Sequence, residues 1–274
     1  MSEPGAGPGA GPDSGAGLAG RRVVVTGAGG GIGAALARRF AAEGARVVVN
    51  DIDAAAARTV ADSCGGEALP GDAASEDGVT SLVSAAADML DGIDLFCANA
   101  GIARPGGAEA AEPDWDACWQ VNVMAHVRAA RLLTGPWLER GSGHLICTVS
   151  AAGLLTMLGS APYSVTKHAA LAFAEWMSVT YAHRGITVQA LCPQGVRTPL
   201  YESSGPIGHA LMDASAITPD EVAAAVVEGI ADGRFLILPH PEVALMYSRR
   251  ATDPDRWLNG MNRLQQQVEK LPDQ

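Results

Sequence analysis

The segment 23–50 constrains the fold most. Val23 to Val25 form a short apolar run, and the next eight residues, 26–33, contain five glycines. Residues 34–43 then have the composition of a helix that ends at Gly44, and a second strand is predicted at 46–50. A strand, a glycine loop, a helix and a strand in this order predict a right-handed parallel unit.

The alternation of strands and helices continues along the chain. Further strands are predicted at 67–71, 94–98, 144–150, 187–192 and 235–238. Helices are predicted at 54–63, 76–90, 113–137 and 161–181, from Thr218 onward, and on both sides of Pro254. This order predicts one α/β domain at 21–274, with a Rossmann-like, doubly wound parallel sheet of about seven strands and helices on both faces. Residues 1–20 are rich in Gly, Pro and Ala and are predicted to form a disordered tail.

Composition excludes several function classes. The net charge is −11 and no block of Lys or Arg occurs, which argues against nucleic acid and anionic membranes as partners. The N-terminus lacks the basic start and apolar core of a signal peptide, and no apolar run reaches the length of a membrane span. Five cysteines without a Cys-x-x-Cys pair indicate a reducing cytoplasm and neither a disulfide nor a metal site.

The glycine loop has the spacing of a dinucleotide-binding turn. Gly27, Gly31 and Gly33 allow unusual backbone angles and close approach of the main chain to a pyrophosphate. The diphosphate would lie at the start of the following helix, near Ile32 and Gly33, where free N–H groups favour negative charge. The alternative is a glycine-rich turn without a ligand.

Asp51 favours NAD over NADP. It lies 18 residues beyond Gly33, where a carboxylate accepts hydrogen bonds from a ribose and repels a 2′-phosphate. No Lys or Arg occurs at 28–32 to bind such a phosphate. Alternatively, Asp51 caps the next helix and Asp53 binds the ribose, or neither residue does. Asp72 and Ala73 contact the adenine edge or form a turn, and the sequence favours neither reading.

Ser150, Tyr163 and Lys167 predict a proton-transfer site. Tyr163 and Lys167 are four residues apart on one helix face, and Ser150 ends a predicted strand. An ammonium beside a tyrosine stabilises its phenolate and is expected to lower the pKa of Tyr163 from about 10 towards neutrality. Only two lysines, Lys167 and Lys270, are present among the 19 Lys and Arg residues. A lysine in an otherwise apolar helix therefore suggests that a compact ammonium is needed at position 167. Alternatively, Tyr163 and Lys167 are unrelated surface residues.

Two asparagines are further candidates. Asn122 lies among apolar residues of the predicted 113–137 helix, where a buried amide must be hydrogen-bonded. Asn99 precedes Ala100 and Gly101 at a strand end. Each asparagine either takes part in the site or forms structural hydrogen bonds to neighbouring backbone.

Together these motifs make the chain resemble the short-chain dehydrogenase/reductase family, strongly over about 22–200. The resemblance implies that Tyr163 is the general acid/base, that Lys167 binds the nicotinamide ribose and lowers the tyrosine pKa, and that Ser150 orients the substrate oxygen. It implies that Asn122 holds a water in a proton relay and that Asn99, Ala100 and Gly101 line the cofactor cleft. It also places Pro193, Val196 and Thr198 near the nicotinamide. The family usually has Pro-Gly where this chain has Pro193-Gln194.

The expected reaction is hydride transfer between NAD(H) and an uncharged, hydrophobic secondary alcohol or ketone. The predicted substrate pocket includes Leu155, Gln194, Leu200 and Tyr201, with a substrate loop at about 196–217. Apolar neighbours that would complete the pocket are Leu154, Met157, Leu158, Ile207, Leu211 and Met212, and Arg197 and His209 are the charged or titratable residues in reach. Gly205, Pro206 and Gly208 suggest a mobile lid.

The predicted assembly and the alternatives follow from the same features. The 161–181 helix is apolar nearly all round, which predicts a partner subunit. The resemblance implies a homotetramer, or a dimer, through helices 113–137 and 161–183. Two other functions remain open on the same fold: a lyase or epimerase that uses NAD transiently, and a redox-silent NAD-sensing protein.

Overall fold

A seven-stranded parallel sheet forms the centre of the molecule, in the order β3-β2-β1-β4-β5-β6-β7. The computed structural model describes residues 17–203, 208 and 212–270. The strands are β1 (Arg22–Val25), β2 (Arg46–Val49), β3 (Glu67–Ala68), β4 (Leu95–Ala98), β5 (Gly143–Thr148), β6 (Ile186–Leu191) and β7 (Leu236–Ile237). Each strand overlaps a range predicted from the sequence, so the predicted parallel sheet is confirmed.

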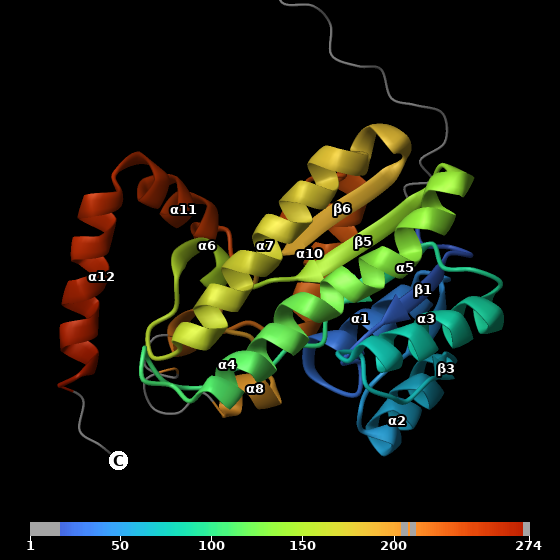
Figure 1. Cartoon of the computed structure of the whole chain (residues 1–274), viewed down its shortest axis with the longest axis horizontal. Helices are drawn as coiled ribbons and strands as arrows, with labels where there is room; N and C mark the ends of the chain where they lie inside the picture. Colours follow the sequence, from blue (N-terminus) through green and yellow to red (C-terminus); the bar gives the residue numbers. More distant parts are fainter. Residues whose placement is uncertain (1–16, 204–207, 209–211, 271–274) are drawn as a thin grey trace, which may run out of the picture.

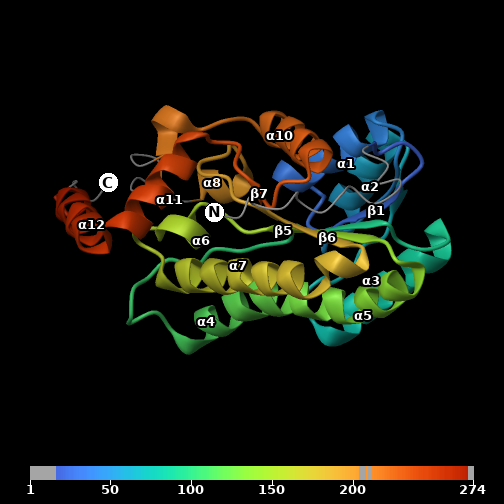
Figure 2. The same cartoon turned by 90° about the horizontal axis from the view of Figure 1, so that it is seen from above.

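Helices cover both faces of the sheet, as Figures 1 and 2 show. On one face lie α3 (Glu76–Leu90), α4 (Glu112–Trp119), α5 (Ala125–Arg140) and α7 (Ala161–Tyr181). On the other lie α1 (Gly31–Ala42), α2 (Ala54–Cys64) and α10 (Pro219–Asp232). The remaining helices are α6 (Ala152–Leu155), α8 (Pro199–Glu202), α11 (Glu242–Thr252) and α12 (Pro254–Val268), with short 3₁₀ turns at Ala182–Arg184 and Asp213–Ser215. The doubly wound α/β architecture is therefore confirmed.

The strand order places a topological switch point at the carboxyl ends of β1 and β4. β1 pairs with β2 on one side and with β4 on the other, so the chain reverses its direction of travel across the sheet at β1. In open α/β sheets, ligands bind outside the carboxyl ends of the strands at such a switch point. The loops after β1, β4, β5 and β6 are therefore the ones that can form a site.

The apolar runs of the strands fill two cores, one on each face of the sheet. In β1, Val24 contributes to the core with Phe96, whereas Val23 and Val25 contribute to the opposite core with Phe40. Successive side chains of a strand point to opposite faces, so a strand covered on both faces is apolar without interruption. This burial explains why the valine runs could be recognised as central strands.

Side-chain caps fix where several helices begin. Asp53 accepts hydrogen bonds from the Ala55 and Ala56 amides at the start of α2. Thr218 and Glu221 form a reciprocal capping box at the start of α10, with Pro219 at its first position. Such caps satisfy amides that have no partner within the helix. The predicted N-cap role of Thr218 is confirmed.

Two predicted boundaries differ from the structure. Leu18 is buried in the core beside α1, and the Gly20 amide donates to the Gly44 carbonyl, so ordered packing begins before residue 21. The predicted 113–137 helix is interrupted by a π-helical turn at Gln120–Met124. A π turn is rare and often marks a functional position, and this one contains Asn122.

None of the helices in the described part of the chain combines the length and the apolar composition of a membrane span.

Candidate active site

The glycine loop between β1 and α1 is closely packed against the segment that follows β4. A Cβ atom at Gly27, where φ is 60°, would lie 2.8 Å from the Ala100 Cα. A Cβ atom at Gly33 would lie 2.3 Å from the Gly27 carbonyl oxygen. These positions therefore cannot hold a larger residue unless the backbone moves.

The space in front of this loop fits a diphosphate. A Cβ atom at Gly30, the N-cap of α1, would meet nothing within 4 Å. No side chain caps α1 and no acidic residue lies in its first turn, so the N–H groups near Ile32 and Gly33 remain suited to an anion. At one side, the Thr198 methyl group would lie 3.1 Å from a Cβ at Gly31. The open space before Gly30 and the uncapped start of α1 are consistent with a diphosphate site, which remains a prediction.

Asn99 joins this loop to the sheet. Its side-chain amide donates to the Thr26 carbonyl at 2.9 Å, and its oxygen accepts from the Thr148 hydroxyl at 3.1 Å. The Thr26 hydroxyl in turn accepts from the amides of Asn99 and Ala100. The Asn99 side chain therefore makes a structural tie between β1, β4 and β5, which was one of the two readings open from the sequence.

The Asp51 carboxylate lies against the glycine loop. It accepts from the Gly29 amide at 2.8 Å and from the Asp53 amide at 3.0 Å. The alternative in which Asp51 caps the following helix is wrong, because Asp53 occupies that N-cap. Asp51 is half-buried and stands at the open end of the loop, where a ribose could reach it.

Asp72 forms a turn at the start of α3. Its carboxylate accepts from the Ala74 and Ser75 amides at 2.8 and 3.1 Å, and the Ser75 hydrogen bond holds the Asp72 pKa below its usual value. Ala73 is half-buried beside it. The turn reading therefore accounts for the Asp72 carboxylate. A cavity of about 190 Å³ opens next to it and is lined by Asn50, Leu69, Pro70, Gly71, Asp72, Gly78, Ser81, Leu82 and Ala85.

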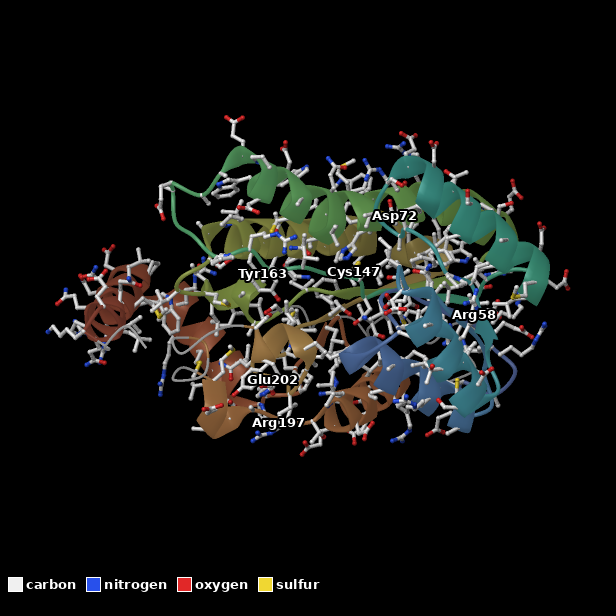
Figure 3. The ribbon with its side chains drawn as sticks, turned by 90° about the horizontal axis from the view of Figure 1, so that it is seen from below. Arg58, Asp72, Cys147, Tyr163, Arg197 and Glu202 are labelled. Carbon is white, nitrogen blue, oxygen red and sulfur yellow. The ribbon has the colours of Figure 1, made fainter. Side chains whose placement is uncertain are left out.

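Ser150, Tyr163 and Lys167 come together at the carboxyl end of β5. The Ser150 hydroxyl is near enough to the Tyr163 phenol to influence its pKa. Lys167, one turn further along α7, has its Nζ 5.5 Å from the centre of the Tyr163 ring and donates to the Thr148 carbonyl at 2.9 Å. Figure 3 shows Tyr163 of α7 and Cys147 of β5 in the interior of the molecule. The alternative of two unrelated surface residues is wrong, because Tyr163 and Lys167 are both buried.

The expected direction of the Tyr163 pKa shift is wrong for this structure. Burial raises the pKa of the Tyr163 phenol above 10, and the hydrogen bond from Ser150 opposes this shift only in part. Burial also lowers the pKa of Lys167 to about 8. The ammonium is directed at the Thr148 carbonyl rather than at the phenol oxygen, and both groups lose hydration, so desolvation outweighs their attraction.

Ser150 has a strained backbone that directs its side chain. Its φ is 150°, a region that residues with a Cβ seldom adopt. The Ser150 hydroxyl donates to the Pro193 carbonyl at 3.4 Å and accepts from the Ala152 amide at 3.1 Å. Such strain persists where surrounding contacts impose it and is common at active sites.

The Asn122 side chain ties the π turn to its neighbours. Its oxygen accepts from the Ile102 amide at 3.0 Å, and its NH₂ group donates to the Ile102 carbonyl at 2.9 Å and to the Thr166 hydroxyl at 3.0 Å. These bonds hold the segment after Gly101 against α7. The side chain thus makes the structural tie that was the alternative to a water-binding role, and that role remains a prediction.

The segment after β6 forms another wall of the site. The Pro193 carbonyl accepts from the Ala151 amide at 2.7 Å, in addition to the Ser150 hydroxyl. Val196 pairs with Ile217 in a short parallel bridge. The Thr198 hydroxyl caps α8 by accepting from the Tyr201 amide. Pro193, Val196 and Thr198 thus lie between Ser150 and the glycine loop.

The four residues predicted to line a substrate pocket have different surroundings. Leu155 is buried in the core, and Leu200 is 42% exposed. Tyr201 is buried, and its hydroxyl donates to the Asp213 carboxylate. The Gln194 side chain turns to Met246 of α11, and its amide oxygen is buried without a hydrogen-bond partner. Ile207, Leu211 and His209, and the lid residues Gly205 and Pro206, lie outside the described residues.

Several residues of the site were not singled out from the sequence. Thr26, Thr148 and Thr166 hold the two asparagines, and His240 contacts the segment after β6. Threonines in strands and helices give no local signal. His240 stands between two prolines after the last strand, a pattern that predicts a fixed loop but no contact. Among the described residues, no group of three His, Cys, Asp or Glu side chains gathers as metal ligands would.

Comparison with known proteins identifies the family. The sequence model described as short chain dehydrogenase matches residues 21–206. The chain belongs to the short-chain dehydrogenase/reductase family. Members of this family of oxidoreductases bind a nicotinamide cofactor, NAD or NADP.

Relatives include dehydrogenases that bind either nicotinamide cofactor. The 1-deoxy-11-beta-hydroxypentalenate dehydrogenase of Streptomyces exfoliatus is 35% identical over 238 residues, covering 82% of this chain and 85% of that protein. A short-chain dehydrogenase from Burkholderia phymatum, solved with NAD, is 27% identical with a TM-score of 0.80 and covers 87% of this chain and 95% of its own. A structure described as an NAD(P)-dependent gluconate 5-dehydrogenase from Beutenbergia cavernae, with bound NADP, is 26% identical with a TM-score of 0.74 and covers 84% of this chain and 99% of its own.

Proposed function

We propose that this protein is an NAD-dependent dehydrogenase that transfers a hydride between NAD(H) and a secondary alcohol or ketone. One observation carries the proposal. The Ser150 hydroxyl lies near the Tyr163 phenol, the Lys167 ammonium lies one turn along α7, and the glycine loop after β1 leaves open space before Gly30. A hydroxyl, a phenol and an ammonium in one buried place can orient a carbinol oxygen and move its proton.

Tyr163 transfers the proton in this mechanism. In the oxidative direction the Tyr163 oxygen, once it has lost its own proton, takes the proton of the substrate hydroxyl as the C–H hydride leaves, so that the alcohol becomes a ketone. In the reductive direction the phenol gives that proton to the new alkoxide. When bound, the nicotinamide supplies the hydride acceptor or donor at its C4. Because burial raises the pKa of Tyr163, the phenol carries its proton at neutral pH, ready for ketone reduction.

The other side chains hold the reacting groups in place. Ser150, fixed between the Pro193 carbonyl and the Ala152 amide, orients the substrate oxygen. Lys167 remains largely protonated below its pKa of about 8 and binds the nicotinamide ribose beside Tyr163. Asn122 holds the loop after Gly101 against α7, and a water in the proton path is part of its predicted role. Orientation of this kind supplies much of the rate enhancement in an enzyme whose cofactor carries the redox chemistry.

The preference for NAD rests on Asp51. Its carboxylate stands at the end of β2 against the glycine loop, where a 2′-phosphate would be repelled. The loop 28–32 contains no cation to offset this repulsion. The Burkholderia relative, solved with NAD, is consistent with this choice, whereas the Beutenbergia structure holds NADP. We therefore expect kcat/KM to be at least about tenfold higher with NAD than with NADP.

The substrate we propose is uncharged and hydrophobic. Leu200 is a partly exposed apolar side chain in the segment after Thr198, whereas Leu155 and Tyr201 are buried and Arg197 is exposed. The Streptomyces exfoliatus relative is named for a substrate with an 11-beta hydroxyl group and a carboxylate, so it supports the hydroxyl and the carbon framework but not the absence of charge. A hydroxyl on an apolar carbon framework is the feature that we carry over to this chain.

A partner subunit is part of the proposal. On α7, the exposed apolar side chains Val165, Trp176 and Val179 lie at helical spacing, with Trp119 of α4 on the same layer. A continuous apolar stripe of this kind is a candidate subunit interface. We propose a cytoplasmic homotetramer or dimer through α4, α5 and α7, which light scattering would test. The cysteines among the described residues are free thiols, in line with a reducing compartment.

A screen of secondary alcohols and ketones tests the proposed function. Purified protein is assayed with NAD(H) and NADP(H) against hydrophobic cyclic and open-chain substrates, and absorbance at 340 nm is followed. Net formation or consumption of NADH is the expected result. Product formation without net NADH would instead indicate a lyase or epimerase. Tight NAD binding with no turnover across the panel would indicate the redox-silent sensor.

A further inference from the structure

His240 links two segments beside the site through both of its ring nitrogens. It lies between β7 and α11 and is 2% exposed. Its Nδ1 lies 3.1 Å from the Gln194 amide nitrogen, and its Nε2 lies 3.1 Å from the Ser215 carbonyl oxygen. Because a backbone amide can only donate and a carbonyl can only accept, His240 must be neutral with its proton on Nε2.

The first of these contacts is close to the reacting groups. Gln194 follows Pro193, whose carbonyl accepts from the Ser150 hydroxyl and from the Ala151 amide. The chain of contacts from His240 therefore reaches Ser150 through a single peptide unit. A small rotation of that unit would move the Pro193 carbonyl and, with it, the Ser150 hydroxyl.

The second contact closes the base of the predicted substrate loop. The Ile217 amide donates to the Gly195 carbonyl at 3.1 Å, and the Arg197 amide donates to the Ile217 carbonyl at 2.9 Å. The segments 194–197 and 215–217 thus run side by side, and His240 joins their ends. The Gln194 side chain meets Met246 on α11, so the helix after His240 packs at the same junction.

We propose that His240 is a positioning residue for the substrate oxygen. It fixes the peptide between Pro193 and Gln194 and so sets where the Ser150 hydroxyl points; this rests on the proposed role of Ser150. An apolar side chain would be enough to fill this space. Both ring nitrogens of His240 instead form hydrogen bonds with main-chain groups of two different segments. The chain replaces the glycine usual after Pro193 with Gln194, and His240 holds this departure from the family pattern in place.

Two conservative variants separate the two hydrogen bonds. In His240→Asn, the side-chain oxygen can occupy the place of Nδ1 and keep the bond to the Gln194 amide. In His240→Gln, the side-chain NH₂ can occupy the place of Nε2 and keep only the bond to the Ser215 carbonyl. His240→Phe fills the volume and keeps neither. We expect kcat to stay within about threefold of wild type in the Asn variant and to fall about tenfold or more in the Gln and Phe variants, with the Kd for NAD unchanged.

A double-mutant cycle with Ser150→Ala tests whether the effect passes through Ser150. Once the Ser150 hydroxyl is removed, His240→Phe should lower kcat by less than about twofold, because residues that act through one group are not additive. An equal loss of kcat in both backgrounds would overturn the proposal, as would wild-type kcat in the His240→Phe enzyme.

Hydrogen exchange provides a readout that does not depend on activity. In the intact protein, peptides that cover 193–197 should exchange at least about tenfold faster in His240→Phe than in wild type, and His240→Asn should restore protection. Unchanged exchange in all variants would also overturn the proposal. If the wild-type protein shows no turnover, the proposed function fails, whereas the exchange data still decide whether His240 fixes this peptide.

Discussion

Lys167 is an ammonium held where an apolar group would be more stable. Its side chain is 2% exposed, and burial lowers its pKa from 10.5 to about 8. Below pH 8 both the folded and the unfolded chain carry this proton, so the full cost of burying the charge is present at pH 7. Between pH 8 and 10.5 only the unfolded chain retains the proton, and the stability of the folded state rises with pH.

Lys167→Met should therefore stabilise the fold and abolish turnover. We expect the free energy of unfolding to increase by about 1–2 kcal/mol at pH 7, the gain being limited by the lost bond to the Thr148 carbonyl. Activity should fall at least about a hundredfold. Urea unfolding at pH 7 and pH 9.5 measures the gain, which should shrink at the higher pH. A less stable variant at pH 7 would show that the ammonium contributes net stability.

The element that begins the site, β1 with its loop and α1, depends on two glycines in different ways. Gly33 has no room for a Cβ, because the Gly27 carbonyl would lie 2.3 Å away. Gly30 has an extended backbone and open space before it, so a Cβ there would point into the proposed diphosphate site. In this proposal Gly33 is needed for the packing of the loop, and Gly30 is needed for the binding of the ligand.

This difference can be measured with two alanine variants. Gly33→Ala should lower the melting temperature by several degrees, since the loop or helix must shift. Gly30→Ala should leave the melting temperature within about two degrees of wild type and weaken NAD binding about tenfold or more. Calorimetric titration with NAD and thermal melts distinguish the two. Equal effects of both substitutions on stability and binding would contradict the assignment.

Features of the fold that depend on local sequence patterns could be predicted from the sequence alone. Valine runs, the glycine loop and the Thr218 cap are local patterns, so the strands, their order of alternation and the helix starts could be predicted. Leu18, the π turn at 120–124 and the contacts of Gln194 depend on packing between distant segments. The predicted direction of the Tyr163 pKa shift was wrong for the same reason, because desolvation is a property of the folded interior.

For the whole molecule, acid stability depends on two buried neutral imidazoles. Burial lowers the pKa of both His126 and His144 to about 3. His144 contacts Gln189 and Arg21, whereas neither ring nitrogen of His126 has a hydrogen-bond partner. An unfolded chain binds protons at both histidines below about pH 6.5, and the folded chain does not. Each histidine therefore makes the folded state lose stability as the pH falls from 6.5 towards 3, by about 1.4 kcal/mol per pH unit.

Removing His126 should reduce this loss. His126→Leu should be at least as stable as wild type at pH 7, because it replaces an unpartnered buried imidazole by an apolar group of similar size. Between pH 6 and pH 5 its unfolding free energy should fall by about 1.4 kcal/mol less than that of wild type. Urea titrations at the two pH values give this difference, in which the contributions of the carboxylates cancel. Parallel pH profiles of the two proteins would show that His126 is protonated in the folded state.

Proton transfer by the Tyr163 phenol is the step on which the proposed reaction depends. The most direct measurement is kcat for Tyr163→Phe beside Tyr181→Phe, which makes the same chemical change at the far end of α7. Both variants should bind NAD within about twofold of wild type. Tyr163→Phe should lose at least about a hundredfold in kcat, while Tyr181→Phe should retain wild-type turnover. Wild-type kcat in Tyr163→Phe, with NAD binding intact, would contradict the account.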